Sequence, residues 1–193
     1  MSPRLYGLMG RKRSGKDSLG NFLVEKHGYE NVKMVEPLRR ALLTLDPIVD
    51  WDGGEPIRLS EVVEFQGWDT AKEDTPEVRR LMQVFGTEVA RDQFGQDFWV
   101  NTARRVIQDI LDDGVSVVVT DIRFPNEAQM IYDLGGELVK IERPGLPDQD
   151  GHASESAWRS IQPDRIFWND ADLQKVERYA DHLATFGRIP SNV

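Results

Sequence analysis

The chain has 193 residues, of which 39% are hydrophobic and 30% charged, and this fits a globular protein with a substantial core. Its 33 acidic residues outnumber 24 basic ones, and a net charge of −9 argues against broad binding to nucleic acid polymers or anionic membranes. The absence of cysteine excludes disulfides, thiolate metal sites and a cysteine nucleophile. We see no signal peptide or membrane-spanning segment in the sequence, so we expect the protein in the cytoplasm.

The most informative pattern lies near the N-terminus, where an apolar run at 4–9 predicts a buried strand. Directly after it, Gly10, Gly15 and Lys16 match the phosphate-binding loop G-x-x-x-x-G-K-[S/T] at every position but the last. Asp17 stands at that last position, and Ser18 follows. Glycines let backbone N–H groups turn toward phosphate oxygens, and the helix that begins there adds its positive end. An ordinary strand-turn-helix is the alternative, and the apolar strand before the motif disfavours it.

The remaining elements alternate along the chain. Apolar runs predict further strands at 32–35, 115–120, 137–142 and 165–168. Helical spacing and capping residues predict helices at about 17–26, 37–45, 59–66, 76–89, 97–112, 125–134 and 170–186, with one more beginning at Ser154. We expect loops at 46–56 and 67–75 and a tail at 187–193. This alternation predicts an α/β fold, a five-stranded parallel sheet with helices on both faces.

Ligands of such sheets bind beyond the carboxyl ends of the strands. The loop from Gly10 to Lys16, Pro37, Asp121 and Arg143 each follow a predicted strand, so we expect them to meet in one cleft. An acid at a strand end, in a chain with a phosphate loop, is typical of a residue that holds Mg²⁺ or one of its waters. Asp121 is therefore a predicted magnesium residue.

The helix that begins at Pro76 carries a second group of polar residues. Arg79, Gln83 and Thr87 are spaced four apart, and Arg80 lies beside them. This group suits the recognition of a phosphate and a base edge, although a solvated polar face would have the same spacing. Trp99, in the next helix, is interpreted first as a core aromatic and second as a surface on which a base could stack.

Taken together, these residues resemble the deoxynucleoside monophosphate kinases of bacteriophages, within the nucleoside monophosphate kinase group of P-loop proteins. The matching stretches run in the family's order over most of the chain: 10–18, 36–38, 78–87, 98–100, Asp121-Ile-Arg123 with Glu127, Arg143-Pro-Gly145 and His152-Ala-Ser-Glu155. Asp after the loop lysine is itself a feature of the family, which accounts for Asp17.

The resemblance implies the P-loop NTPase fold and transfer of the γ-phosphoryl group of ATP to a deoxynucleoside 5′-monophosphate, supplying DNA precursors. It assigns catalytic roles to Lys16, Asp17, Arg123 and Arg143, and the resemblance together with the strand-end argument assigns Mg²⁺ to Ser18, Asp17 and Asp121. ATP would be bound by Gly10, Arg11, Lys12, Arg13, Ser14, Gly15, Lys16, Asp17 and Ser18. The acceptor nucleotide would be bound by Lys33, Pro37, Leu38, Arg79, Arg80, Gln83, Gly86, Thr87, Trp99, Arg123, Asn126, Glu127 and Glu155.

The resemblance also implies one P-loop kinase domain over 1–193, with an acceptor-binding helical insertion at about 37–112 and a lid at about 143–155 that contains Arg143 and His152. Its partners would be small nucleotides, in the host cytoplasm if the protein is phage-encoded, and family precedent suggests a homodimer. Two alternatives stay open: a kinase of another small phosphorylated acceptor, of the phosphomevalonate type, and a nucleotide-binding regulator without turnover. A polynucleotide 5′-kinase is disfavoured by the acidic charge.

Overall fold

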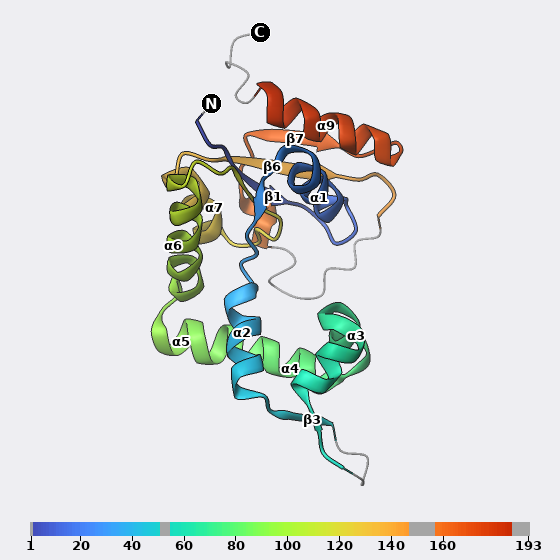
Figure 1. Cartoon of the computed structure of the whole chain (residues 1–193), viewed down its shortest axis with the longest axis vertical. Helices are drawn as coiled ribbons and strands as arrows, with labels where there is room; N and C mark the ends of the chain where they lie inside the picture. The colour runs from blue at the N-terminus through green and yellow to red at the C-terminus, as the bar shows by residue number, and fades with distance from the viewer. Residues whose placement is uncertain (1, 51–54, 147–156, 187–193) are drawn as a thin grey trace. The chain divides into compact units, whose positions relative to one another are not determined.

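The computed structural model describes residues 2–50, 55–146 and 157–186. The chain folds as two compact units, one drawn from residues 1–34 and 103–193 and the other from residues 35–102 (Figure 1). The acceptor-binding insertion expected at about 37–112 is a functional assignment and stays a prediction.

In the described part of the first unit, five strands form one parallel sheet in the order β2-β5-β1-β6-β7. These strands are β1 (Leu5–Met9), β2 (Glu30–Asn31), β5 (Val117–Val119), β6 (Glu137–Glu142) and β7 (Arg165–Trp168). The five residues of β1 and the three of β5 are all buried, as expected of interior strands covered on both faces. The predicted α/β fold is therefore confirmed.

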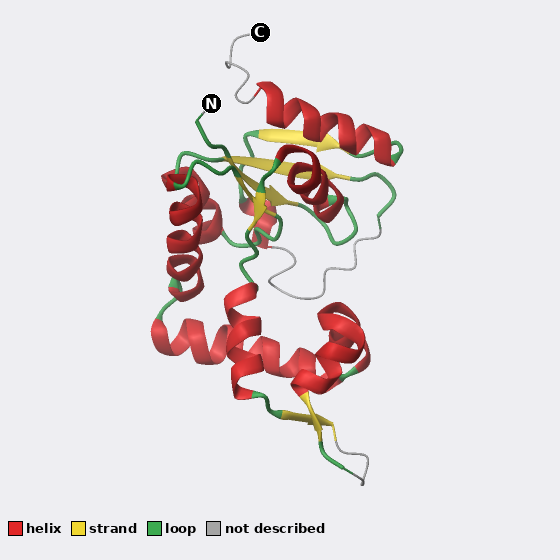
Figure 2. Cartoon of the chain, in the orientation of Figure 1, coloured by secondary structure: helices red, strands yellow, loops and turns green. Residues whose placement is uncertain are grey.

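Helices cover both faces of this sheet (Figure 2). On one face, α1 (Lys16–His27) and α9 (Leu173–Phe186) lie side by side and bury Leu19, Leu23 and Leu183 against β1, β6 and β7. On the other face, α7 (Pro125–Asp133) packs so closely that a Cβ built at Gly7 of β1 would lie 3.0 Å from Ile131. The unit also contains most of α6 (Phe98–Asp112) and the short 3₁₀ helix η2 (Ala157–Ser160).

The second unit is mainly helical. It contains α2 (Glu36–Leu45), α3 (Leu59–Asp74), α4 (Pro76–Val84), the π-helical turn η1 (Phe85–Val89) and α5 (Ala90–Phe94). Two short strands, β3 (Ile48–Asp50) and β4 (Ile57–Arg58), form an antiparallel pair among the described residues. Its core includes Leu38, Leu42, Leu59, Val78 and Trp99, all buried.

Two predicted loops of this unit are wrong. The stretch predicted as a loop at 46–56 contains β3, because Val49 turns inward to the core while its neighbours pair with β4. The stretch at 67–75 is largely helical, since α3 resumes after one non-helical residue, Gly67, at φ 75°. The resumed turns bring Trp68 and Ala71 onto the core, so tertiary packing restores a helix that local sequence interrupts.

The predicted strand at 32–35 is also misplaced. The strand is β2 at Glu30–Asn31, and the ladder ends with the Val32 N–H donating to the Val118 carbonyl at 3.0 Å. The next available N–H, that of Met34, donates instead to Asp121 Oδ1 at 2.9 Å. This side-chain acceptor draws the chain away from the sheet and into α2.

The helix predicted from Pro76 is interrupted in a way that the sequence does not reveal. Residues 85–89 form a π-helical turn, which is a widened turn within a continuous helical path. Such turns occur frequently at functional sites. The start of the helix predicted from Ser154 lies outside the described residues, and the described part of that stretch contains only the 3₁₀ helix η2 at Ala157–Ser160.

Candidate active site

The loop between β1 and α1 has an unusual backbone. Gly10, Arg13 and Gly15 have positive φ values of 137°, 66° and 108°. A Cβ at Gly10 would lie 2.4 Å from the carbonyl oxygen of Ile141 in β6, so only glycine fits there. The loop is thus pressed against the carboxyl end of β6 and turns directly into the N-terminus of α1.

Lys16 is the first residue of α1 and lies over this loop. Its Nζ donates to the carbonyl oxygens of Gly10 at 2.9 Å and Arg11 at 2.8 Å. The ammonium group is therefore held beside the loop backbone, where the positive end of the helix adds to its field. This is the arrangement that a phosphate-binding loop requires, and Asp17 and Ser18 follow in the first turn.

Three neighbouring parallel strands, β5, β1 and β6, bring their carboxyl ends to this loop. The Ile122 N–H donates to the Leu8 carbonyl at 3.2 Å, which extends the β1–β5 pairing to the edge of the sheet. In α1, a Cβ at Gly20 would lie 2.4 Å from Thr120 Cγ2, so the first turns of α1 pack on the end of β5. Asp121 follows β5 and the exposed Arg143 follows β6 at the same edge.

Asp121 is half-buried, and its Oδ1 accepts the Met34 N–H described above. That hydrogen bond orients the carboxylate from the segment that joins β2 to α2, where the half-buried Lys33 also lies. Among the residues that the structure describes, no group of three or more His, Asp or Glu side chains could by itself hold a metal ion.

Arg123, Asn126 and Glu127 lie around the start of α7. Glu127 is only 4% exposed, and its carboxylate accepts the backbone N–H groups of Arg123 at 2.8 Å and Phe124 at 3.1 Å. Asn126 Oδ1 accepts the Glu127 N–H at 3.1 Å. Glu127 and Asn126 therefore fix the backbone on which the exposed Arg123 side chain is carried.

Within the second unit, four predicted acceptor residues lie exposed along α4 and η1: Arg79, Arg80, Gln83 and Thr87. Arg79 Nε donates to the Lys72 carbonyl at 3.1 Å. Arg80 donates two hydrogen bonds to the Glu77 carboxylate, at 2.7 and 2.6 Å. This pair lowers the pKa of Glu77, chiefly through the hydrogen bond from Arg80.

A pocket of about 280 Å³ opens in the same unit between α2, η1, α5 and α6. Its walls are almost wholly apolar: Pro37, Ala41, Phe85, Val89, Ala90, Phe94, Phe98, Trp99 and Thr102. Trp99 is 8% exposed, stands edge-on to Phe98 at 4.8 Å, and donates from Nε1 to the Gly86 carbonyl at 3.0 Å. The pocket thus brings together Pro37 and Trp99, two of the residues that the family resemblance assigns to the acceptor nucleotide.

Other predicted residues do not reach this pocket. Leu38 is buried in the core of the unit, where its Cδ2 would meet a Cβ at Gly86 at 3.3 Å. Gln83 and Thr87 are not among the residues that line it. His152 and Glu155 lie outside the described residues, as does most of the predicted lid at 143–155.

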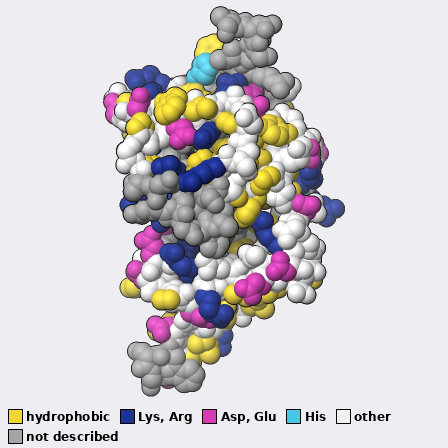
Figure 3. All heavy atoms as spheres, turned by 180° about the vertical axis from the view of Figure 1, so that it is seen from behind, with side chains coloured by type: hydrophobic (Ala, Val, Ile, Leu, Met, Phe, Trp, Pro, Cys, Tyr) yellow, Lys and Arg dark blue, Asp and Glu magenta, His cyan; other side chains and the backbone are white. Residues whose placement is uncertain are grey.

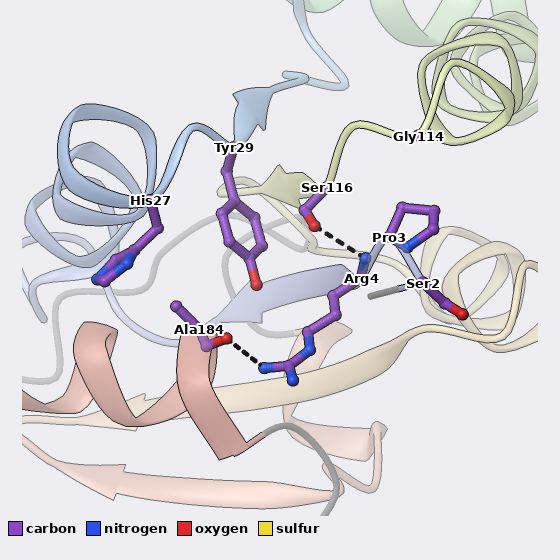
Figure 4. Close-up of a pocket in the computed structure, with 8 residues that line it drawn as sticks. All are labelled: Ser2, Pro3, Arg4, His27, Tyr29, Gly114, Ser116 and Ala184. Atoms are coloured by element: carbon purple, nitrogen blue, oxygen red, sulfur yellow. Dashed lines mark hydrogen bonds between the residues drawn. The ribbon is translucent and has the colours of Figure 1, made fainter.

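A smaller pocket, of about 160 Å³, lies at the opposite edge of the sheet, where the strands begin (Figure 4). Arg4 points across it and donates to the carbonyls of Leu183 and Ala184 at 2.5 and 2.6 Å, which caps the C-terminus of α9. The Arg4 N–H donates to Ser116 Oγ at 3.0 Å. None of the described residues that line this pocket was a predicted site residue, and its polar groups join strands to α9.

One residue that contacts the loop was not predicted from the sequence. Asn169 follows β7, is 5% exposed, and donates from Nδ2 to the carbonyl oxygen of Ser14 at 2.8 Å. The signal that singled out Asp121 and Arg143, a polar residue directly after a strand, was present at Asn169 too. An isolated Asn after a strand is common in turns, so the sequence did not distinguish it.

On the face seen in Figure 3, basic and acidic side chains are interspersed over the described surface, so neither sign of charge dominates it. No helix in the described ranges has both the length and the apolar character needed to cross a bilayer. A parallel sheet, a phosphate-binding loop with its lysine, and an acid at the end of the neighbouring strand are the features of a P-loop nucleotide-binding protein.

Comparison with known proteins gives the family. Residues 45–179 match the family model described as deoxynucleotide monophosphate kinase. Over 181 residues the chain is 32% identical to a protein of Acanthamoeba polyphaga mimivirus named for the same kinase, covering 89% of this chain and 91% of that one. It is 23% identical to the deoxynucleotide monophosphate kinase of Enterobacteria phage T4, with 90% and 95% coverage.

Among solved structures, dephospho-CoA kinase from Campylobacter jejuni aligns with a TM-score of 0.51 at 11% identity, over 95% of this chain and 96% of that one. This likeness supports the fold alone. The chain belongs to the deoxynucleotide monophosphate kinase family. The resemblance inferred from the sequence is confirmed, and with it the prediction of an ATP-dependent kinase that acts on deoxynucleoside monophosphates.

Proposed function

We propose that the residues described above divide the phosphoryl transfer between donor-binding residues, at the carboxyl edge of the sheet, and acceptor-binding residues, which lie on α2, α4 and η1 of the second unit and at the start of α7 in the first. The product is the deoxynucleoside diphosphate, a precursor of DNA. The observation that carries this proposal is the loop whose lysine folds over its own carbonyls beside the ends of β5 and β6.

On the donor side, the N–H groups from Gly10 to Ser18 and the ammonium of Lys16 bind the β- and γ-phosphates of ATP. Arg11, Lys12 and Arg13 add positive charge around the same loop. Phosphoryl transfer requires little covalent chemistry from the protein, so these groups act by holding the phosphates in line and neutralising their charge. Arg143, which follows β6, contributes a planar guanidinium to the transferred group.

The donor side also suits Mg²⁺. Asp17, Ser18 and Asp121 offer hard oxygen ligands, and Asp121 is already oriented by the Met34 N–H. Mg²⁺ keeps several waters and shares substrate phosphates, so it does not need a cluster of three protein acids. These three residues would hold the ion or its waters, and the bound ion would neutralise charge on the phosphates. Asp17 has the further role of accepting a hydrogen bond from the acceptor side.

Arg79 and Arg80 of the second unit and Arg123 of the first are our candidates for bidentate donors to the 5′-phosphate, and Lys33 is a candidate for adding charge. The exposed guanidinium of Arg80 and the rigid backbone under Arg123 favour this role. We assign Glu127 and Asn126 an indirect role in acceptor binding, because their hydrogen bonds hold the backbone that carries Arg123.

The acceptor base would occupy the apolar pocket, between Pro37 and the ring of Trp99. Such a pocket suits a flat, largely apolar ligand whose orientation is set by a few polar groups. Gln83 and Thr87, which do not line this pocket, would contact the base edge and the sugar where these extend beyond it. Leu38 and Gly86 would shape the wall from behind, because Leu38 packs against Gly86, whose carbonyl accepts the Trp99 hydrogen bond. Glu155 and His152 complete the assignments as the acceptor and lid residues that the family resemblance implies.

A coupled assay of ADP release tests the proposal. The panel contains each dNMP and NMP, phosphomevalonate and an oligonucleotide with a free 5′-hydroxyl, each with ATP and Mg²⁺. We expect ADP release with one or more dNMPs and none with the oligonucleotide. Absence of ADP release with every dNMP would contradict the proposal, and release with phosphomevalonate alone would favour the rival acceptor.

A further inference from the structure

Asn169 joins the last strand of the sheet to the phosphate-binding loop. Its own N–H donates to the Glu142 carbonyl at 2.8 Å, which fixes it to the carboxyl end of β6. Its Nδ2 reaches across to the Ser14 carbonyl, also at 2.8 Å, from a position only 5% exposed. A residue 155 positions away in sequence is thus hydrogen-bonded to the centre of the loop.

This hydrogen bond constrains more than one atom. In a planar trans peptide, the carbonyl and the following N–H point in opposite directions. Because Asn169 holds the Ser14 carbonyl toward the end of β7, the N–H of Gly15 in the same peptide must point away from it. Gly15 precedes Lys16 in the motif, so its N–H is one of those that the proposed function directs at a phosphate.

The shape of the loop depends on the same contact. A Cβ at Gly15 would lie 2.5 Å from Asn169 Nδ2, so the glycine and the asparagine are matched in shape as well as in hydrogen bonding. Two residues earlier, Arg13 has a φ of 66°, which is unfavourable for a residue with a side chain. Such a conformation persists only where its surroundings hold it. Ser14, between them, is 1% exposed, so the loop rests on the body of the unit through this point.

We propose that Asn169 is a positioning residue for phosphoryl transfer: through the Ser14 carbonyl it holds the Ser14–Gly15 peptide in the orientation that binds ATP. The proposal rests on the proposed function of the loop. Asn169 acts through the loop backbone and is not itself a catalytic residue.

The test uses two substitutions in the full chain. Asn169→Asp is isosteric, but an ionised carboxylate has no N–H to donate and repels the Ser14 carbonyl. Asn169→Ala removes the donor without adding charge. We expect both to raise the KM for ATP on the order of tenfold, the effect of losing a hydrogen bond to a buried carbonyl, while the KM for the dNMP stays within twofold.

The pH profile separates positioning from a merely structural role. A protonated carboxylic acid can donate to the Ser14 carbonyl, so lowering the pH toward 5 should restore the ATP KM of Asn169→Asp toward that of the wild type at the same pH. Asn169→Ala should show no such recovery. Asp170→Asn is the matched control, because the neighbouring Asp170 is exposed and pairs with Lys175.

Several outcomes would overturn the proposal. An ATP KM within twofold of wild type in both variants would do so, as would a fall in thermal midpoint with no change in KM. An equal rise in both substrates' KM values would indicate general loss of structure. If Asn169→Asp does not fold, the KM values of Asn169→Ala for ATP and for the dNMP decide between the outcomes. If Asn169→Ala does not fold either, Asn169→Ser takes its place in the same comparison. Inactivity of the wild type would instead defeat the proposed function.

Discussion

Lys16 is the residue on which donor binding most depends. Its ammonium contacts two loop carbonyls at the N-terminus of α1, so its removal takes a positive charge away from the triphosphate. We predict that Lys16→Ala lowers kcat by a factor on the order of 10² to 10³, as for other single groups that stabilise transition-state charge. Steady-state ADP release measures this effect.

The matched control for Lys16 lies on the same helix. Lys26 pairs with Glu177 at the far end of α1, and Lys26→Ala should leave kcat and both KM values near those of the wild type. Substantial turnover by Lys16→Ala would count against the assigned role of Lys16.

Arg80 tests the acceptor side. It is exposed and pairs only with the neighbouring Glu77 among the contacts described above, so its loss should cost little stability. We predict that Arg80→Ala raises the KM for the dNMP on the order of 10- to 100-fold, because a charged hydrogen bond to the acceptor phosphate is lost. Initial rates at varied dNMP and saturating ATP measure this change.

Arg105→Ala, an exposed arginine of α6, is the control for charge alone and should leave the dNMP KM unchanged. If Arg80→Ala changes only the KM for ATP, the assignment of Arg80 to the acceptor phosphate is wrong.

At the scale of elements, α1 packs on the end of β5, the strand that precedes Asp121. Gly20 faces Thr120, which is 1% exposed and cannot move aside. We predict that Gly20→Ala destabilises the fold, because overpacking costs about 1 to 3 kcal/mol and outweighs the roughly 1 kcal/mol that alanine contributes as a better helix former. The free energy of unfolding in denaturant measures the loss.

A double-mutant cycle identifies the cause of that loss. Thr120→Ser removes the Cγ2 that the new Cβ would meet and keeps the hydroxyl that faces Asn31 Oδ1 at 3.4 Å. Gly20→Ala should therefore cost less in the Thr120→Ser background. An equal cost in both backgrounds would show that the clash lies elsewhere.

At the scale of the whole molecule, the buried Tyr29 and the half-buried Tyr179 link stability to alkaline pH. Burial raises the pKa of Tyr29 and of Tyr179 to about 12, from an ordinary value of 10.0. The fold therefore favours the neutral phenol, and this contribution is complete below pH 10 and is lost as pH rises from 10 to 12. We predict that the free energy of unfolding falls across the lower part of this window.

Tyr179→Phe keeps the ring stacked on Phe167, where the centroids are 4.2 Å apart, and removes the titrating hydroxyl. Its free energy of unfolding, measured from pH 8 to 11, should fall less steeply with pH than that of the wild type. Parallel curves for the two proteins would contradict the assignment to Tyr179.

The sequence by itself determined the phosphate-binding loop, the strand before it, the α/β class and the kinase family. These features are local or periodic: a glycine motif of a few residues, and apolar spacing that repeats along each element. The place of Asp121 just after a central strand was predictable for the same reason, since a dense apolar run precedes it and β5 ends at Val119.

Only the tertiary structure decided how residues distant in sequence support that motif. Asn169 contacts Ser14 because β7 ends beside the loop. In the second unit, Asp, Gly and Pro locally favour loops around β3, β4 and the second half of α3. These elements form nevertheless, because side chains from them complete the core of that unit. Packing between distant segments leaves no local periodicity to detect, so these contacts could not be predicted from the sequence.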